Sequence, residues 1–285
     1  MSKVLYKKDG RIGRITLNRP EVMNAIDDDL PGELAAAVAQ ADADTGVHVI
    51  VLSGNGPAFC AGYDLKHYAE GASTNQVVQE MPWDPMQDYA FMWANTQHFM
   101  SLWRAMKPVI CKIHGFAVAG GSDLALCSDI TIMGENAKIG YMPTRVWGTP
   151  TTAMWVYRLG AEKAKRMLFT GDKVDGKEAE AMGLVLKAVP DNQLDSEVEQ
   201  FAQRMASVPI NQLTMQKILV NQAIEASGML NTQRLATIFD GISRHSPEGI
   251  NFKSRVEEVG WRQAVSERDQ GTFDWTTAQK FDGES

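Results

Sequence analysis

Two glycine turns contain the residues of this chain whose types and spacing are best suited to chemistry. The segments 57–65, PAFCAGYDL, and 115–129, GFAVAGGSDLALCSD, each follow a short β-branched apolar run. Each therefore predicts a strand that leaves a sheet and turns sharply through glycine. A helix is expected to begin at Gly121 in the second turn, and the first N–H groups of a helix have no partner within it. Two such turns facing each other would direct two N–H groups at one oxygen atom, as in an oxyanion hole.

A sheet with intervening helices is needed to position these turns, and the apolar pattern predicts one. A strand, a helix and a strand follow one another in the first 53 residues, which indicates a βαβ unit with a parallel sheet. A strand, a glycine turn and a helix follow again in the same order at 109–128. The polar tail 272–285 is expected to be frayed. The expected strands are 3–7, 12–18, 47–53, 109–114 and 129–134, and the expected helical regions are 27–43, 87–106, 121–128 and 191–266.

The polar segment 69–88 lies between the first glycine turn and the next expected helix. Pro82 and Pro85 prevent a continuous helix there. A loop of this length in a compact domain is usually functional or mobile. We therefore interpret the segment either as a lid over the substrate site or as a surface insertion.

The length, composition and charge of the chain limit the classes of protein to which it can belong. The chain has 285 residues, of which 44% are apolar and 22% charged, enough for one large domain or one domain with a small appendage. The net charge of −7 and the lack of a Lys/Arg-rich run argue against nucleic acid as a partner. No run approaches the roughly 18 apolar residues of a membrane span. The N-terminus has no apolar signal core, so a cytoplasmic protein is expected.

Cysteine and histidine give no sign of a metal site. The three cysteines, Cys60, Cys111 and Cys127, lie among apolar or small residues and are expected to be buried thiols in a reducing compartment. The five histidines show no spacing suited to metal ligation. No metal is predicted.

Short motifs stand in a fixed order along nearly the whole chain. They are ITLNRP at 15–20 with Asn24-Ala25, FCAGYDL at 59–65, KPVI at 107–110, AGGSDLAL at 119–126, RLG at 158–160, LFTG at 168–171 and AEAMGLV at 179–185. In this order they resemble the crotonase (enoyl-CoA hydratase/isomerase) superfamily. The resemblance implies an α/β fold, a crotonase-like spiral of ββα repeats over residues 1–205, and a C-terminal helical subdomain with a tail over 206–285.

The resemblance also assigns chemical roles at the two turns. It places an acyl-CoA thioester carbonyl between the N–H groups of Tyr63 and Gly120, so that an enolate oxygen is stabilised. Asp123, where family hydratases place a catalytic glutamate, becomes the expected acid/base. The alternative is a carboxylate that only stabilises the helix N-terminus.

Substrate-binding residues follow from the same resemblance. Coenzyme A is expected as part of the substrate, with no permanently bound cofactor. The aromatic and polar residues Tyr141, Arg145, Trp147 and Thr151 indicate a pocket for a polar or ring-bearing acyl group. The implied substrate-binding residues are Asn24, Ala25, Ala61, Gly62, Asp64, Leu65, Lys66, Gly121, Tyr141, Thr144 and Trp147.

One feature departs from the family pattern. No Asp or Glu occurs between Glu135 and Glu162, and Thr144 stands nearest to the position of the second catalytic glutamate of hydratases. Because water addition normally uses two carboxylates, standard hydration is placed in doubt. Glu80, Asp84 or Asp88 of the 69–88 segment could supply the missing acid.

The expected enzyme is therefore a lyase of the enoyl-CoA hydratase type, or an isomerase, acting on acyl-CoA. The alternatives are a CoA-thioester hydrolase or C–C lyase of the same superfamily, and a catalytically silent acyl-CoA-binding protein. A homotrimer or a dimer of trimers is expected from the apolar helices at 87–106 and in the C-terminal third.

Overall fold

The computed structural model describes residues 2–70, 79 and 81–280. Its main sheet has six strands in the order β1-β2-β3-β4-β6-β9, and all neighbours are parallel except β1 and β2. A smaller sheet has the order β5-β7-β8. The strands are β1 Val4–Asp9, β2 Ile12–Leu17, β3 Val49–Gly54, β4 Val109–Ile113, β5 Phe116–Val118, β6 Ile130–Gly134, β7 Lys138–Gly140, β8 Lys173–Asp175 and β9 Lys187–Val189, with a short hairpin of β10 Phe273–Asp274 and β11 Gln279–Lys280.

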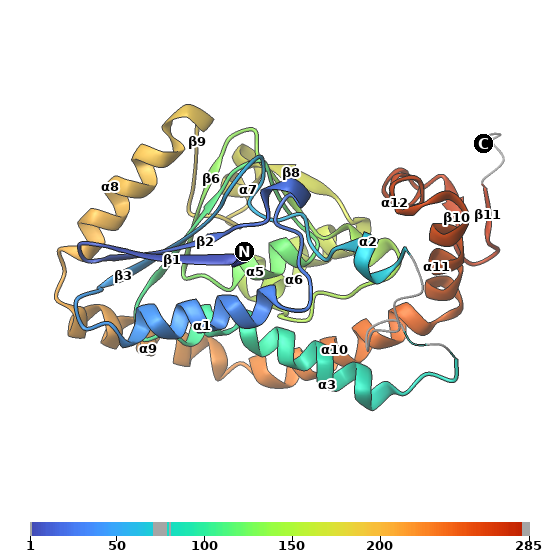
Figure 1. Ribbon diagram of the computed structural model, residues 1–285, viewed down its shortest axis with the longest axis horizontal. Helices are drawn as coiled ribbons and strands as arrows, with labels where there is room; N and C mark the ends of the chain where they lie inside the picture. Colours follow the sequence, from blue (N-terminus) through green and yellow to red (C-terminus); the bar gives the residue numbers. More distant parts are fainter. Residues whose placement is uncertain (1, 71–78, 80, 281–285) are drawn as a thin grey trace.

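The helices surround these sheets and continue into a C-terminal group (Figure 1). The helices are α1 Leu30–Ala43, α2 Leu65–Tyr68, α3 Pro85–Phe99, α4 Ser101–Arg104, α5 Gly120–Leu126, α6 Met154–Thr170, α7 Gly176–Ala181, α8 Leu194–Ala206, α9 Ile210–Glu225, α10 Met229–His245, α11 Pro247–Val259 and α12 Trp261–Gln270. The expected domain boundary after residue 205 lies at the end of α8. Within the described residues, no helix combines the length and the apolar character that crossing a membrane would need.

The two sheets form successive turns of a spiral. Strand β4 runs into β5, and β6 runs into β7, so each unit contributes one strand to each sheet. Strand β4 pairs with β6 while β5 pairs with β7, both in parallel, so consecutive units stack on each other. This is the crotonase-like arrangement of ββα repeats that the motifs predict.

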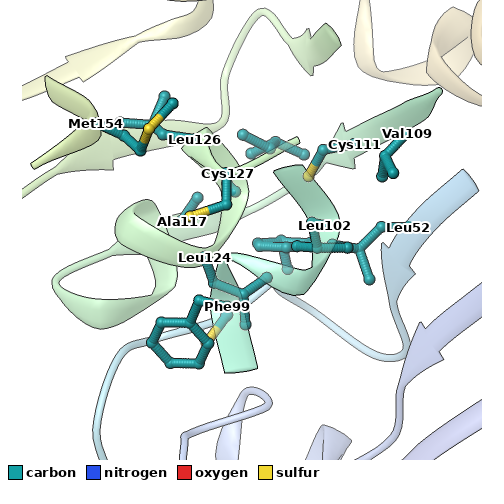
Figure 2. Close-up of a cluster of buried hydrophobic side chains, with 14 of the residues drawn as sticks. Leu52, Phe99, Leu102, Val109, Cys111, Ala117, Leu124, Leu126, Cys127 and Met154 are labelled. Atoms are coloured by element: carbon teal, nitrogen blue, oxygen red, sulfur yellow. The ribbon is translucent and has the colours of Figure 1, made fainter. Parts of the chain in front are cut away.

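The hydrophobic core holds the short helix α5 from several sides. Figure 2 shows side chains from β3, β4, β5, α3, α4 and α6 gathered around α5, and all of them are buried. On the opposite face of the main sheet, α8 packs across the strands through a second cluster that includes Val198 and Ala202. The polypeptide around α5 is therefore held in place by buried side chains from both sheets and from neighbouring helices.

The cysteines are buried thiols, as expected. All three are free and buried. Burial raises the pKa of Cys60 to about 12 and raises those of Cys111 and Cys127 as well, so none is a ready thiolate nucleophile.

Three local predictions were wrong. The first long helix begins at Leu30 rather than at 27, because Asp27 instead accepts the N–H of Leu30. The predicted helix 87–106 is two helices, α3 and α4, which meet at Met100. The tail is ordered as far as residue 280, because Phe273 and Trp275 are buried against α11 and α12. Residues 281–285 lie outside the described part of the chain.

Candidate active site

The two glycine turns lie against each other, as the sequence predicts. The Cys60 N–H donates to the Phe116 carbonyl at 2.9 Å, and the Val118 N–H donates to the Cys60 carbonyl at 3.1 Å. This short parallel bridge between Cys60 and Ala117 fixes the first turn alongside β5, immediately before α5 begins. Residues 61–63 follow Cys60, and residues 119–121 follow β5. The bridge therefore brings these two short segments together.

Two backbone N–H groups at this junction are unbonded. Neither the Tyr63 N–H nor the Gly120 N–H donates a hydrogen bond to any residue that the structure describes. Tyr63 is flanked by two ladder bonds to Ile26, from the Ile26 N–H to the Gly62 carbonyl at 2.8 Å and from the Asp64 N–H to the Ile26 carbonyl at 2.9 Å. Its own N–H is left to point away from that ladder. Gly120 is the first residue of α5, where a helix supplies no partner for it.

Glycine is required on both sides of this junction. A Cβ at Gly62, where φ is +90°, would lie 2.7 Å from the Ala119 Cβ and 3.3 Å from the Gly120 nitrogen. A Cβ at Gly121 would lie only 2.3 Å from the Cys60 carbonyl oxygen. Ala119 itself has φ of 51° and ψ of −130°, a conformation that L-residues rarely adopt. Strained backbone of this kind concentrates at functional sites.

Asp123 lies one turn into α5 with its side chain buried. The residue is 3% exposed, and its Oδ1 accepts the hydroxyl of Thr152 at 2.9 Å. Burial, with a smaller contribution from the negative charge of Asp240, raises the pKa of Asp123 to about 8 against the opposing effect of hydrogen bonds from Thr152 and Thr151. The carboxyl group therefore carries a proton at neutral pH, and it is poised near the pH at which general acids and bases work best.

Two tyrosines complete this part of the site. The Tyr63 hydroxyl lies 3.5 Å from the Asn95 Nδ2, and burial raises the pKa of both Tyr63 and Tyr141. Tyr141 is 6% exposed, and the described residues offer its hydroxyl no hydrogen-bond partner. The hydroxyl is not among the fully buried polar atoms left without a partner, so it keeps contact with solvent and can donate to a bound group.

A buried charge cluster, which sequence reasoning missed, lies beside these tyrosines. It consists of Asp88 of α3 with Asp240 and Arg244 of α10, and the Arg244 guanidinium donates to both carboxylates. The indole N–H of Trp83 also donates to Asp88, at 3.2 Å, and the N–H of Thr149 donates to Asp240 at 2.9 Å. Burial raises the pKa of Asp88 to about 6. We call these three residues the Asp88–Arg244–Asp240 cluster.

The predicted coenzyme A residues lie together at the mouth of the first turn, but their side chains have other contacts. The Asn24 side chain is fully buried and bonds the carbonyls of Asn55 and Ala58, while Ala25 is buried beside it and its carbonyl accepts the Arg19 guanidinium. Asp64 caps α2 and pairs with the same guanidinium. The neighbouring Ala61 and Leu65 are partly buried, and Lys66 is exposed on α2.

Two predicted acyl-pocket residues serve the framework. The Thr144 hydroxyl donates to the Leu168 carbonyl at the end of α6. The Trp147 ring packs 5.3 Å from the Phe252 ring in the cluster beneath α11. Of the candidates for a missing acid, Asp84 caps α3 by accepting two N–H groups, Asp88 belongs to the charge cluster, and Glu80 lies outside the described residues.

No group of three His, Cys, Asp or Glu side chains suited to a metal ion occurs in the described part of the chain. The groups available for chemistry are therefore the unbonded N–H groups of Tyr63 and Gly120, the buried Asp123 carboxyl with its raised pKa, and the Asp88–Arg244–Asp240 cluster.

The spiral of ββα units with a C-terminal helical subdomain defines a protein of the crotonase class, and comparison with known proteins agrees. The family model described as enoyl-CoA hydratase/isomerase matches residues 7–251. The chain belongs to this family.

Individual relatives match most of the chain. A probable enoyl-CoA hydratase of Mycobacterium tuberculosis is 30% identical over 242 residues, covering 81% of this chain and 87% of the relative. A probable mitochondrial enoyl-CoA hydratase of Dictyostelium discoideum is 32% identical over 253 residues, with 88% and 80% covered. A crystal structure of an enoyl-CoA hydratase from Mycobacterium smegmatis is similar with a TM-score of 0.89 and 44% identity, covering 95% of this chain and 94% of that one.

Proposed function

We propose that this protein acts on acyl-CoA thioesters by stabilising an enolate. The thioester oxygen would accept the N–H groups of Tyr63 and Gly120, and Asp123 would move the proton at the α-carbon. The observation that carries the proposal is the pair of unbonded N–H groups beside the buried Asp123 carboxyl, whose pKa burial raises. The family membership and the enoyl-CoA hydratases among the relatives support the choice of acyl-CoA.

The chemistry explains why such a site needs these groups. Adding or removing a proton next to a thioester carbonyl builds negative charge on its oxygen. Preorganised N–H donors stabilise that charge, and loss of one donor typically costs ~3 kcal/mol of transition-state stabilisation. Protonated Asp123 can donate to the α-carbon of an enoyl-CoA. Ionised at higher pH, the same group can remove an α-proton.

Coenzyme A would be held as part of the substrate and not as a resident cofactor. The backbone at 24–25 and 61–65 would receive the pantetheine and adenine, and exposed Lys66 would lie near phosphate. Because the side chains of Asn24 and Asp64 are already bonded within the protein, we assign their contribution to shaping the loop.

Calorimetry paired with an absorbance assay tests the proposal. Titrations with CoA, acetyl-CoA and crotonyl-CoA should show binding, and a panel of enoyl-CoA esters should show loss of the enoyl-thioester absorbance. Binding without turnover over a broad panel would favour a silent acyl-CoA-binding protein. If no CoA ester binds, the proposal is wrong.

We also propose a homotrimer or a dimer of trimers. Helices α9 and α10 expose apolar side chains to solvent, which is unusual for a monomer of this size. These are Met215, Ile218, Leu219 and Val220 of α9 and Leu230, Leu235, Ile238, Phe239 and Ile242 of α10.

Light scattering gives the assembly directly. Leu219→Asp, at a side chain 66% exposed on α9, should reduce the wild-type mass to that of smaller species. Leu186→Asp, at a similarly exposed leucine before β9, serves as the control and should leave the mass unchanged. A wild-type monomer at all concentrations would contradict the proposal.

A further inference from the structure

We infer that Asp240 is the second acid/base group of the reaction and works opposite Asp123 on the acyl chain. This inference rests on the proposed function. It supplies, from the C-terminal helix α10, the carboxylate that the segment 136–161 does not contain.

The position of Asp240 is fixed at the edge of the site. The residue is 3% exposed, and its Oδ1 accepts the Thr149 N–H. A Cβ at Gly148 would lie 2.7 Å from the Pro143 Cβ, 3.2 Å from the Tyr141 hydroxyl and 3.7 Å from this Oδ1. The lack of a side chain at Gly148 therefore lets the Tyr141 hydroxyl and the Asp240 carboxylate approach the same stretch of backbone. A carboxylate oxygen with one N–H partner keeps a further acceptor site for a ligand.

The same loop that holds Asp240 also holds Asp123. Gln233 of α10 donates to the Thr152 carbonyl at 3.0 Å, and the Thr152 hydroxyl donates to Asp123. The loop 149–152 is thus bonded to α10 at both ends, through Thr149 and through Thr152. Thr152 also bonds the Asp123 carboxyl of α5. The two carboxyl groups are therefore bonded to the same short loop, Asp240 at Thr149 and Asp123 at Thr152.

The electrostatics agree with this geometry. The charge of Asp240 raises the pKa of Asp123, Tyr63 and Tyr141, whereas Asp88 is not among the main influences on Asp123. The charged and titratable groups around Asp240 are Arg244 on its own helix, Asp88 of α3 with His245 beside it, and the two tyrosines and Asp123 toward the site.

Within the cluster, Asp240 and not Asp88 is placed to react. Asp88 accepts Arg244 with one oxygen and the Trp83 indole with the other, and the Trp83 ring stacks on His245 at 4.5 Å. Asp88 is therefore bonded to Trp83, which precedes α3. Asp240 is instead bonded to the loop 149–152, which also holds Asp123, while Arg244 bonds its other carboxylate oxygen.

The two carboxyl groups then have complementary roles in water addition. Asp240 takes a proton from water as the water oxygen bonds to the β-carbon of an enoyl-CoA. The C=C π electrons shift to the thioester oxygen, and protonated Asp123 donates its proton to the α-carbon. The product is a 3-hydroxyacyl-CoA, and the proton on Asp240 returns to Asp123 through solvent, so atoms and charge balance.

Two matched variants test the inference, Asp240→Asn and Asp88→Asn. Both remove one carboxylate charge next to Arg244, so a purely structural role predicts equal effects. Two reactions are followed: hydration of enoyl-CoA esters, and exchange of the α-proton of butyryl-CoA in deuterated water. Hydration uses both acid/base groups, whereas exchange uses Asp123 alone.

Asp240→Asn should lower hydration by about two to four orders of magnitude, the usual effect of a positioned proton-transfer group. It should retain α-proton exchange, and the midpoint of the exchange rate against pH should move to lower pH because one negative charge near Asp123 is lost. Asp88→Asn should change hydration by less than about tenfold and leave that midpoint in place. Asp240→Glu should recover part of the hydration activity. If Asp240→Asn does not fold, Asp240→Glu takes its place as the test variant.

Several results would overturn the role of Asp240. Equal loss of both reactions in the two Asn variants would show a structural role. Full hydration by Asp240→Asn would show that another group activates water. A wild-type protein that exchanges α-protons but hydrates no enoyl-CoA would refute Asp240 while leaving Asp123 in place. A wild-type protein that binds no CoA ester would refute the proposed function itself.

Discussion

Replacing Asp123 with asparagine should inactivate the protein and stabilise it at the same time. The asparagine oxygen can still accept the Thr152 hydroxyl, so the local hydrogen bond is kept. The amide cannot exchange a proton with substrate, so turnover should fall by about two to four orders of magnitude. The backbone N–H donors of Tyr63 and Gly120 are unaffected, so the affinity for CoA esters should remain.

The stability change follows from the raised pKa of Asp123. The pKa is about 8 in the folded protein against 3.8 for the ordinary group. Between these values the unfolded chain is ionised while the folded one stays protonated, so the free energy of unfolding of the wild type falls as pH rises. Over the whole window this loss is on the order of 5 kcal/mol, at about 1.4 kcal/mol per pH unit. Asparagine does not titrate and avoids the loss.

Urea unfolding followed by tryptophan fluorescence from pH 4 to pH 8 measures this effect. The variant should match the wild type near pH 4 and become progressively more stable than it toward pH 8. Asp88 also has a raised pKa, but it is present in both proteins and cancels in the difference. Asp195→Asn is the control: this carboxyl is 86% exposed, and Lys112 lowers its pKa, so its effect should be small and opposite in sign.

Two results would refute this reasoning. A stability difference between Asp123→Asn and the wild type that does not change with pH would mean that Asp123 is ionised in the folded protein. Wild-type turnover by the variant would mean that another group moves the proton.

Three further substitutions have clear expectations. Gly121→Ala should destabilise the protein by about 1–3 kcal/mol and impair activity, because the added Cβ would clash with the Cys60 carbonyl that fixes the first turn. Gly32→Ala in α1, where a Cβ would meet nothing within 4 Å, should instead stabilise by about 0.4–1 kcal/mol, and thermal melts of both variants check the contrast. Arg244→Met should cost about 3–5 kcal/mol in unfolding free energy at pH 8, since two buried carboxylates lose their counter-ion. A loss below about 1 kcal/mol would show that water reaches the cluster.

The two glycine turns could be predicted from sequence because the signal for each turn is local. Glycine after a β-branched run marks a turn, and Asp123 follows within one helical turn of Gly120, so the residues that act together are close in sequence. The parallel sheet could be predicted for the same reason, because strands and helices alternate along the sequence and this alternation is typical of βαβ units.

Asp240 could not be predicted in the same way. It lies more than one hundred residues from Asp123, inside a helix whose sequence has no unusual spacing, and only the packing of α10 against α3 brings it to the site. The only sequence pattern that involves Asp240 is its spacing of four residues from Arg244. This spacing is equally typical of an ion pair on a helix surface. The ordered tail was missed for a similar reason, because Phe273 and Trp275 find their partners only after α11 and α12 have folded.

The enolate is the species on which the proposed function depends, so proton exchange at the α-carbon of a bound thioester observes it most directly. Proton NMR of butyryl-CoA in deuterated water, with wild-type protein and Asp123→Asn side by side, makes this measurement. We predict that the wild type exchanges one α-proton, faster as pH rises toward 8, and that the variant binds the thioester equally well but exchanges at the buffer rate. Binding of butyryl-CoA by the wild type with no exchange above the buffer rate would contradict enolate formation between Tyr63 and Gly120.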